Sequence, residues 1–302
     1  MTRRFIFFLI LSLSVMSCRH SNTDKNISED FEIPDSVLTD KPVELDKSVI
    51  DDMVQNIASP IETAAIIKGL KIPFNKEIIA NTKYADNFST NFSKALGLGI
   101  YGCDLGYLNM YQKTSFVVDY ITTIKSLADG IQVGQFFDFT TLKRLATNNE
   151  NIDSLVFISQ QSMTRIDDYL KQNSRSNLSV VIVAGVWIEG LYLTTVVAQQ
   201  SQHQKINETI GDQKEVLNLL LPLLNLYKKD PNIAKLIKDF EEIKKLYNDV
   251  KITIEIGEPE MIEKDGVLSF KQNDIQKIEM SDETLNAIIE KVQEIRSKLL
   301  KG

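Results

Sequence analysis

Histidine, cysteine and an excess of basic charge are what this sequence most clearly lacks. Its 302 residues include two histidines and two cysteines, and 34 basic against 41 acidic side chains give a net charge of −7. A zinc site or a histidine-based catalytic triad needs imidazole groups that the chain hardly has. Nucleic-acid binding needs a basic surface that neutralises phosphates, and the acidic balance argues against one. The sequence therefore predicts no metal ion, no cofactor and no nucleic-acid partner.

Motifs that mark nucleotide, calcium and hydrolase sites are also missing. The glycine-rich run GLGIYG at 97–102 has no preceding strand and no following Lys-Ser/Thr, so it does not predict a phosphate-binding loop. The chain contains no Asp-rich calcium loop, no zinc-binding pair of cysteines and no Gly-x-Ser-x-Gly nucleophile turn. What remains is an ordinary globular balance of 43% apolar and 25% charged residues, enough to bury a sizeable core.

The first seventeen residues predict a signal peptide. Arg3 and Arg4 precede an apolar run at 5–16, which is too short for a membrane-spanning helix. The following VMSC ends at Cys18 and resembles the lipobox of bacterial lipoproteins, in which this cysteine becomes the lipidated first residue. The alternative is an ordinary cleaved signal peptide with Cys18 present by chance. We predict a lipoprotein signal peptide at 1–17 and a lipid anchor at Cys18.

The segment after the anchor predicts a flexible tether. Residues 19–46 are polar and acidic with two prolines, and they lack the apolar content that a core requires. The lipidated cysteine and its tether together therefore cover 18–46. Arg19 is not the aspartate that retains some lipoproteins at the inner membrane. By resemblance to sorting in enteric bacteria, we expect a lipid anchor in the outer membrane of the cell envelope, with the periplasmic and the outward side both open.

Helical periodicity dominates the chain from residue 47 to its end. Apolar residues recur at helical spacing in the segments 115–129 and 152–173, and again after Pro231 and Ser281. The sequence SPIE at 59–62 combines an N-cap serine, a proline at the first helical position and a capping-box glutamate. Each of these features predicts an amphipathic helix or the start of one.

One segment near 251–270 has a different period. KITIEI at 251–256 alternates apolar and polar residues, and MIEKDGVLSF at 261–270 has an Asp-Gly turn between two β-prone runs. We predict a small β-hairpin there. The expected fold is all-α, with one domain at 47–302 that forms a helical bundle of about eight helices and carries this hairpin before the C-terminal helix.

Two segments carry one acid each in an otherwise uncharged apolar run. Glu189 lies within 179–198 and Asp104 within 95–111. The first segment is long enough to span a membrane, but a charged residue at the bilayer centre costs about 2.5 kcal/mol or more. We predict instead that it is the central helix of the bundle, because a helix that is apolar all round is normally buried. Glycines near both acids would let the two helices approach closely.

These acids define a candidate buried polar site, in which each acid is followed three residues later by a tyrosine on the same helix face: Asp104, Tyr107, Glu189 and Tyr192. One interpretation is a pocket that binds a cation or a small polar ligand, or that performs acid–base chemistry. The other is structural, with each buried acid satisfied by tyrosine hydroxyls, a helix N-terminus or an arginine such as Arg144 or Arg165. We favour the structural interpretation, since buried acids in large helical domains are usually paired.

Several stretches resemble a family of all-helical lipoproteins of Gram-negative bacteria. They are ALGLGIYGCDLGY at 95–107, SLAD at 126–129, DSLVFI at 153–158 and GVWIEGLYL at 185–193, within a similarity that covers about 59–198. The family has no assigned activity, so the resemblance implies a helical fold and an envelope location and transfers no catalytic residue. It usually has alanine where this chain has Cys103, which agrees with a small buried side chain rather than a reactive thiol.

Two classes of function follow from these observations. We expect a membrane-anchored envelope lipoprotein that is a non-catalytic binding or interaction module, with an envelope protein or glycan as its partner. The alternative is an envelope hydrolase or another enzyme that uses the buried carboxylates Asp104 and Glu189 as a pair. A pocket that joins both carboxylates would favour the enzyme, whereas two separated and sealed carboxylates would remove it.

Overall fold

The computed structural model describes residues 66–148, 152–201, 203–264, 267–271 and 273–301. The predicted signal peptide, Cys18, the tether and the helix start at 59–62 lie outside these ranges. In chain order the elements are η2 (Lys76–Ile78), η3 (Thr82–Asn87), α3 (Asn91–Met110), α4 (Thr114–Gly130), η4 (Gly134–Phe136), α5 (Phe139–Asn148), α6 (Ile152–Gln172), α7 (Ser176–Ser201), α8 (Gln204–Asn225), α9 (Pro231–Tyr247), β1 (Lys251–Glu255), β2 (Glu260–Lys264), β3 (Val267–Lys271), β4 (Ile275–Glu279) and α10 (Asp282–Leu300).

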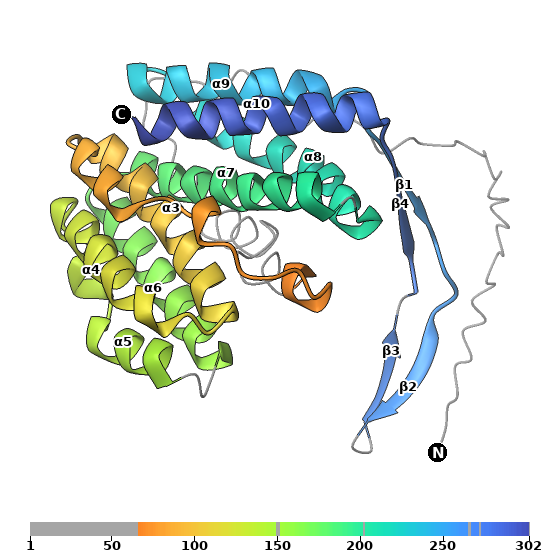
Figure 1. The fold of residues 1–302 in the computed structure, drawn as a ribbon, viewed down its shortest axis with the longest axis horizontal. Coiled ribbons are helices and arrows are strands. Elements are labelled where there is room, and N and C mark those ends of the chain that lie inside the picture. The colour runs from red at the N-terminus through yellow and green to blue at the C-terminus, as the bar shows by residue number, and fades with distance from the viewer. Residues whose placement is uncertain (1–65, 149–151, 202, 265–266, 272, 302) are drawn as a thin grey trace, which may run out of the picture.

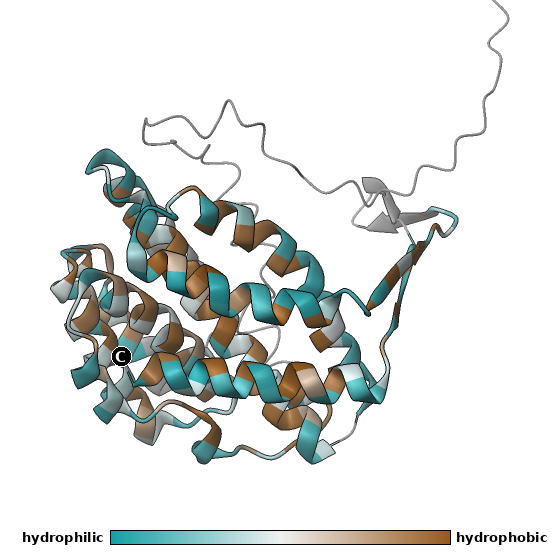
Figure 2. Ribbon diagram, turned by 90° about the horizontal axis from the view of Figure 1, so that it is seen from above, coloured by the Kyte–Doolittle hydropathy of each residue, from teal (hydrophilic) through white to brown (hydrophobic). Residues whose placement is uncertain are grey.

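The predicted helical bundle with a β-hairpin before the last helix is confirmed. Figure 1 shows α7 running through the middle of the bundle, α9 and α10 along one edge, and the strands leaving the bundle beyond the ends of these two helices. The amphipathic pattern is visible in Figure 2, where hydrophobic and hydrophilic residues alternate around the outer helices. The apolar stripes therefore face a shared core, as helical spacing requires.

The outer helices begin where their capping residues predict. Asp230 caps α9 by accepting hydrogen bonds from the N–H groups of Asn232 and Ile233, and Pro231 occupies the first turn. Ser281 caps α10 through the N–H of Thr284. These side chains satisfy backbone donors that have no partner within the helix, so the start of each helix is encoded locally.

The two acid-bearing apolar segments are the helices α3 and α7, which pack directly against each other. A Cβ atom on Gly99 would lie 2.1 Å from the backbone oxygen of Ile182, and one on Gly185 would lie 2.3 Å from the backbone oxygen of Leu96. The helix backbones thus touch at the two glycines, which confirms the predicted close approach. Length and composition would allow α7 to cross a membrane, but 78% of its most hydrophobic window is buried inside the protein.

The strands form two antiparallel pairs that follow one another away from the bundle (Figure 1), and we call the described residues within 251–279 the ribbon. β1 pairs with β4, and β2 pairs with β3 farther out. The prediction recovered the hairpin but missed β4, and the Asp-Gly turn at 265–266 lies outside the described residues. The base of the ribbon rests on α8, where Ile278 lies against Gly211 and the Gln276 amide donates to Asp212 at 2.7 Å.

Candidate functional site

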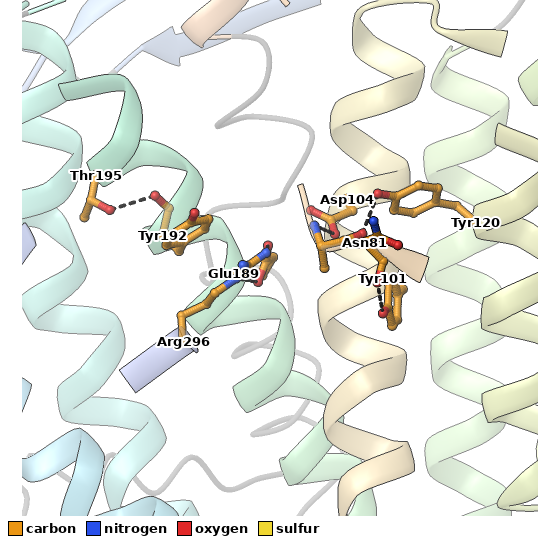
Figure 3. A network of polar contacts seen from close by, with 9 residues as sticks. Asn81, Tyr101, Asp104, Tyr120, Glu189, Tyr192, Thr195 and Arg296 are labelled. Carbon is orange, nitrogen blue, oxygen red and sulfur yellow. Dashed lines mark hydrogen bonds and ion pairs between the residues drawn. The ribbon is translucent and has the colours of Figure 1, made fainter. Parts of the chain in front are cut away.

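The two central acids meet in one buried cluster together with an arginine from the last helix. Asp104 on α3 and Glu189 on α7 are both 0% exposed, and Arg296 on α10 is 7% exposed. Figure 3 shows Glu189 and Asp104 facing each other between their helices, with Arg296 reaching Glu189 from α10. We call these three residues the central cluster. Burying three ionisable groups is costly unless each is paired, so their contacts decide what the cluster does.

Glu189 and Arg296 form a two-pronged ion pair. The Arg296 Nε donates to Oε2 of Glu189 at 2.9 Å, and Nη2 donates to Oε1 at 2.6 Å. The guanidinium also lies over the ring of Tyr192, 4.1 Å from its centroid, which adds a cation–π contact. Burial lowers the pKa of Arg296, but the charge and hydrogen bonds of Glu189 outweigh it and raise that pKa overall. Arg296 is therefore a fixed positive charge.

Asp104 is held differently, by a backbone group. Its Oδ2 accepts a hydrogen bond from the N–H of Ala80 at 2.9 Å, while no donor reaches Oδ1. Burial and then the charge of Glu189 raise the pKa of Asp104 well above its ordinary value, against smaller opposing effects of Arg296 and Ala80. Burial therefore favours the uncharged form of the Asp104 carboxyl group.

Tyrosines on α3 and α4 fix the loop that supplies the Ala80 amide. The Tyr120 hydroxyl donates to the carbonyl of Ala80 at 2.6 Å, and the Tyr101 hydroxyl donates to the carbonyl of Asn81 at 2.8 Å (Figure 3). Burial raises the pKa of both phenols, so they remain protonated donors. The central cluster thus ties together α3, α7, α10 and this loop, with its charges balanced internally.

The two tyrosines of the predicted site do not pair with the acids that precede them. The Tyr107 hydroxyl accepts a hydrogen bond from the backbone N–H of Asn75 at 3.1 Å, and its ring stacks on Phe74 at 5.5 Å between centroids. Tyr192 contributes its ring to Arg296, as described above. Spacing of three residues placed each tyrosine on the same side of its helix as the acid.

The prediction that Arg144 or Arg165 pairs with a buried acid is wrong. Arg165 is exposed and donates to the side-chain oxygen of Gln161 at 3.0 Å, and the exposed Arg144 lies near Asp138. Arg296 was missed, although a signal was present. It follows Val292 by four residues and so falls on the apolar stripe of α10, whose members are Leu285, Ile288, Val292, Ile295 and Leu299. A charged residue in such a stripe predicts a buried ion pair.

The remaining candidates for chemistry are buried or dispersed. Cys103 is 1% exposed and burial raises the pKa of its thiol, so it packs as a small hydrophobe. Among the described residues no three His, Cys, Asp or Glu side chains come together as a metal site.

Comparison with protein families, curated proteins and solved structures finds no match to this chain. Its geometry and its sequence therefore carry the functional argument.

The raised pKa of Asp104 gives a testable dependence of stability on pH. Its folded pKa lies above the unfolded value of about 3.9, so the stability it confers is complete below that pH and is lost as pH rises toward the folded pKa. The loss amounts to about 1.4 kcal/mol per pH unit in that window. Asp104→Asn keeps an acceptor for the N–H of Ala80 and has no carboxyl proton to lose.

We expect Asp104→Asn to be more stable than wild type at pH 7 and to show a flatter decline from pH 5 to pH 8. Urea unfolding of both proteins across this range measures the difference. Asp239→Asn is the control, because this carboxylate is paired with Lys298 near the surface of the same bundle. Parallel pH profiles for wild type and Asp104→Asn would show that Asp104 is ionised in the folded protein.

Proposed function

We propose that this protein is a membrane-anchored envelope lipoprotein and acts as a non-catalytic binding or interaction module. Cys18 is the proposed lipid anchor and the outer membrane the proposed location, with an envelope protein or a glycan as partner. The observation that carries the non-catalytic assignment is the sealing of the central cluster. Asp104 and Glu189 are both 0% exposed and the charge of Glu189 is balanced by Arg296, whereas an active site must admit its substrate.

Membrane attachment through the N-terminus agrees with the use of α7 in the fold. This helix is covered by α3, α8 and α10, and a glutamate–arginine pair lies at its centre. The apolar surface of α7 is therefore buried in the core of the bundle. This burial supports a domain that folds without lipid around it. A long polar segment between anchor and domain would let such a module reach a partner at a distance from the membrane.

A second candidate is an envelope enzyme that uses the two acids as a pair. The observation in its favour is that Asp104 and Glu189 share one site and that the pKa of Asp104 is raised, as in many acid–base pairs. This activity would require the loop at Ala80 to leave Asp104, since that loop and the surrounding helices seal the acids from solvent. The two proposals therefore differ in whether the acids ever meet a substrate.

Affinity purification from membranes separates the two proposals. Wild type and Asp104→Asn are purified with the same tag, and the proteins and glycans that accompany them are identified. A non-catalytic module retains the same partner in equal amount with both chains. An enzyme would turn over its substrate in wild type and accumulate it on Asp104→Asn, and this result would overturn the first proposal. Cys18→Ala is the control for material carried along with the membrane.

The anchor itself is tested by fractionation. We expect Cys18→Ala to move most of the protein from the membrane fraction to the soluble fraction, because no acyl chain is attached. Cys103→Ala is the matched control and should stay with the membrane, since Cys103 is buried in α3. Labelling with a fatty-acid analogue should mark wild type and Cys103→Ala alone. Membrane attachment of Cys18→Ala without label in any variant would contradict the lipoprotein assignment.

A further inference from the structure

The ribbon exposes more large apolar residues than its contact with the bundle explains. Seven large hydrophobic residues are exposed in the described part of the chain, and four of them lie on the ribbon: Ile254 at 64%, Ile256 at 84%, Met261 at 60% and Ile275 at 58%. Figure 2 shows hydrophobic positions on the strands where they project from the bundle. Such a concentration on one projecting element is typical of an interaction surface.

The register of the ribbon places these residues on defined faces. Ile252 lies opposite Ile278, and Ile254 lies opposite Gln276, so these four side chains share one face. The inner part of this face is covered, because Ile252 and Ile278 pack against the core. Ile254, two residues farther out, is left to solvent. The apolar face thus continues past the point at which the bundle covers it.

The outer edge of β1 has no partner strand within the described ranges, because β1 belongs to a sheet of two strands. An open edge presents backbone N–H and C=O groups that can pair with another strand. Proteins often block such an edge with a charged residue at its centre. β4 has Lys277 there, whereas β1 has charges only at its two ends, Lys251 and Glu255, with the exposed Thr253 in the middle.

We propose that two copies of this chain pair through the edges of β1, antiparallel and centred on Thr253. Antiparallel pairing of KITIE with itself sets Lys251 opposite Glu255 of the second copy, and the reverse, at both ends of the contact. Ile252 then meets Ile254 of the second copy on the apolar face. Opposite charges and apolar pairs directly across an antiparallel ladder are the combinations that stabilise it.

Self-pairing of two copies through β4 would be unfavourable, in contrast to self-pairing through β1. Antiparallel pairing of IQKIE with itself sets Lys277 against Lys277 of the second copy, and like charges directly opposite each other are unfavourable. Pairing through β1 also has two-fold symmetry, so it closes as a dimer with a four-stranded sheet in the order β4-β1-β1-β4. This inference rests on the ribbon alone and is independent of the lipid anchor.

Complementary charge variants test the pairing. Lys251→Glu has acids at both ends of β1, and Glu255→Lys has lysines at both ends, so neither can match charges with itself. We expect each to bind itself at least tenfold more weakly than wild type in sedimentation equilibrium on the chain from Arg19 onward, which retains every described residue. An equimolar mixture of the two should recover dimers, because acids then face lysines. Glu255→Lys also removes the ion pair between Glu255 and Lys277 within its own ribbon, and recovery of dimers in the mixture would show that this internal change is not the cause of the weaker self-binding.

Cysteines at directly opposed positions locate the contact. Thr253 and Lys277 face each other across the ribbon, so Thr253→Cys marks the β1 edge and Lys277→Cys marks the β4 edge. We expect Thr253→Cys to form a disulfide-linked dimer under mild oxidation and Lys277→Cys to remain monomeric, because Cα atoms opposite in an antiparallel pair lie within disulfide reach. A monomeric wild type, a mixture that stays monomeric, or cross-linking through Lys277→Cys alone would overturn the proposal. A monomer that binds lipid vesicles through Ile254 would assign the ribbon to a membrane surface instead.

Discussion

Arg296→Met is expected to lower the free energy of unfolding by about 3–5 kcal/mol, the usual cost of removing one partner from a buried ion pair. Glu189 is 0% exposed and receives both of its short hydrogen bonds from Arg296, so this variant leaves a carboxylate that water cannot reach. Methionine fills much of the same volume, and the loss therefore reports the charge and hydrogen bonds. Denaturant unfolding at neutral pH measures it.

Two further variants at the pair separate charge from packing. Glu189→Gln keeps the shape and one acceptor, so it should cost less than Glu189→Leu, which leaves the Arg296 guanidinium buried without its carboxylate. Combining Glu189→Leu with Arg296→Met removes both charges, and we expect the double variant to recover part of the loss. No recovery would mean that packing around the arginine stem, rather than the ion pair, sets its contribution.

Lys298→Met provides the matched control on the same helix. Lys298 donates to Asp239 at 2.5 and 2.8 Å, but its side chain is 44% exposed. Exposed ion pairs contribute about 0–1 kcal/mol, because water and salt screen the charges. We therefore expect Arg296→Met to lower the free energy of unfolding several times more than Lys298→Met does. A loss of similar size for Lys298→Met and Arg296→Met would contradict the sealed central cluster.

Gly99→Ala is expected to destabilise the protein by about 3 kcal/mol, the upper end for overpacking a core. The added Cβ would lie 2.1 Å from the backbone oxygen of Ile182 and 2.7 Å from the backbone nitrogen of Val186. Backbone atoms cannot rotate away as a side chain can, so α3 and α7 would have to separate along their contact. Thermal and denaturant unfolding should both show the loss.

Gly102→Ala is the control about one turn farther along the same helix. No heavy atom lies within 4 Å of the position that the alanine methyl would take, so the substitution adds helix propensity without a clash. We expect it to stabilise the protein by about 0.5–1 kcal/mol. If both alanine variants were stabilising, the close contact between α3 and α7 would be absent.

The local features of this chain could be predicted from its sequence. Helical spacing of apolar residues predicted 115–129, and α4 spans Thr114–Gly130. Asp230 and Ser281 predicted the starts of α9 and α10, because a capping side chain bonds to backbone two or three residues away. The uninterrupted apolar composition around Glu189 predicted the central helix α7. All of these properties depend on residues within one or two turns of each other.

The central cluster depended on the path of the whole chain. Glu189 was singled out as a buried acid, but its partner Arg296 lies 107 residues away. Asp104 was expected to bond a tyrosine hydroxyl, a helix N-terminus or an arginine, and it bonds the backbone N–H of Ala80, a group that every residue except proline carries. The apolar stripe of α10 marks Arg296 as buried but does not identify Glu189 as its partner, and the contact with Ala80 leaves no periodic pattern in the sequence.

The strands show the same division between local pattern and tertiary structure. Alternation identified β1, and turn chemistry placed β2 and β3 as a hairpin. β4 was missed because only one residue of IQKIE between its end positions is apolar, and its pairing with β1 joins segments separated by the whole outer hairpin. The sequence by itself determined which segments are helical, apolar or extended, since those properties arise from neighbours along the chain. Tertiary structure alone decided which charges are buried together, because that depends on how distant segments share a core from which water is excluded.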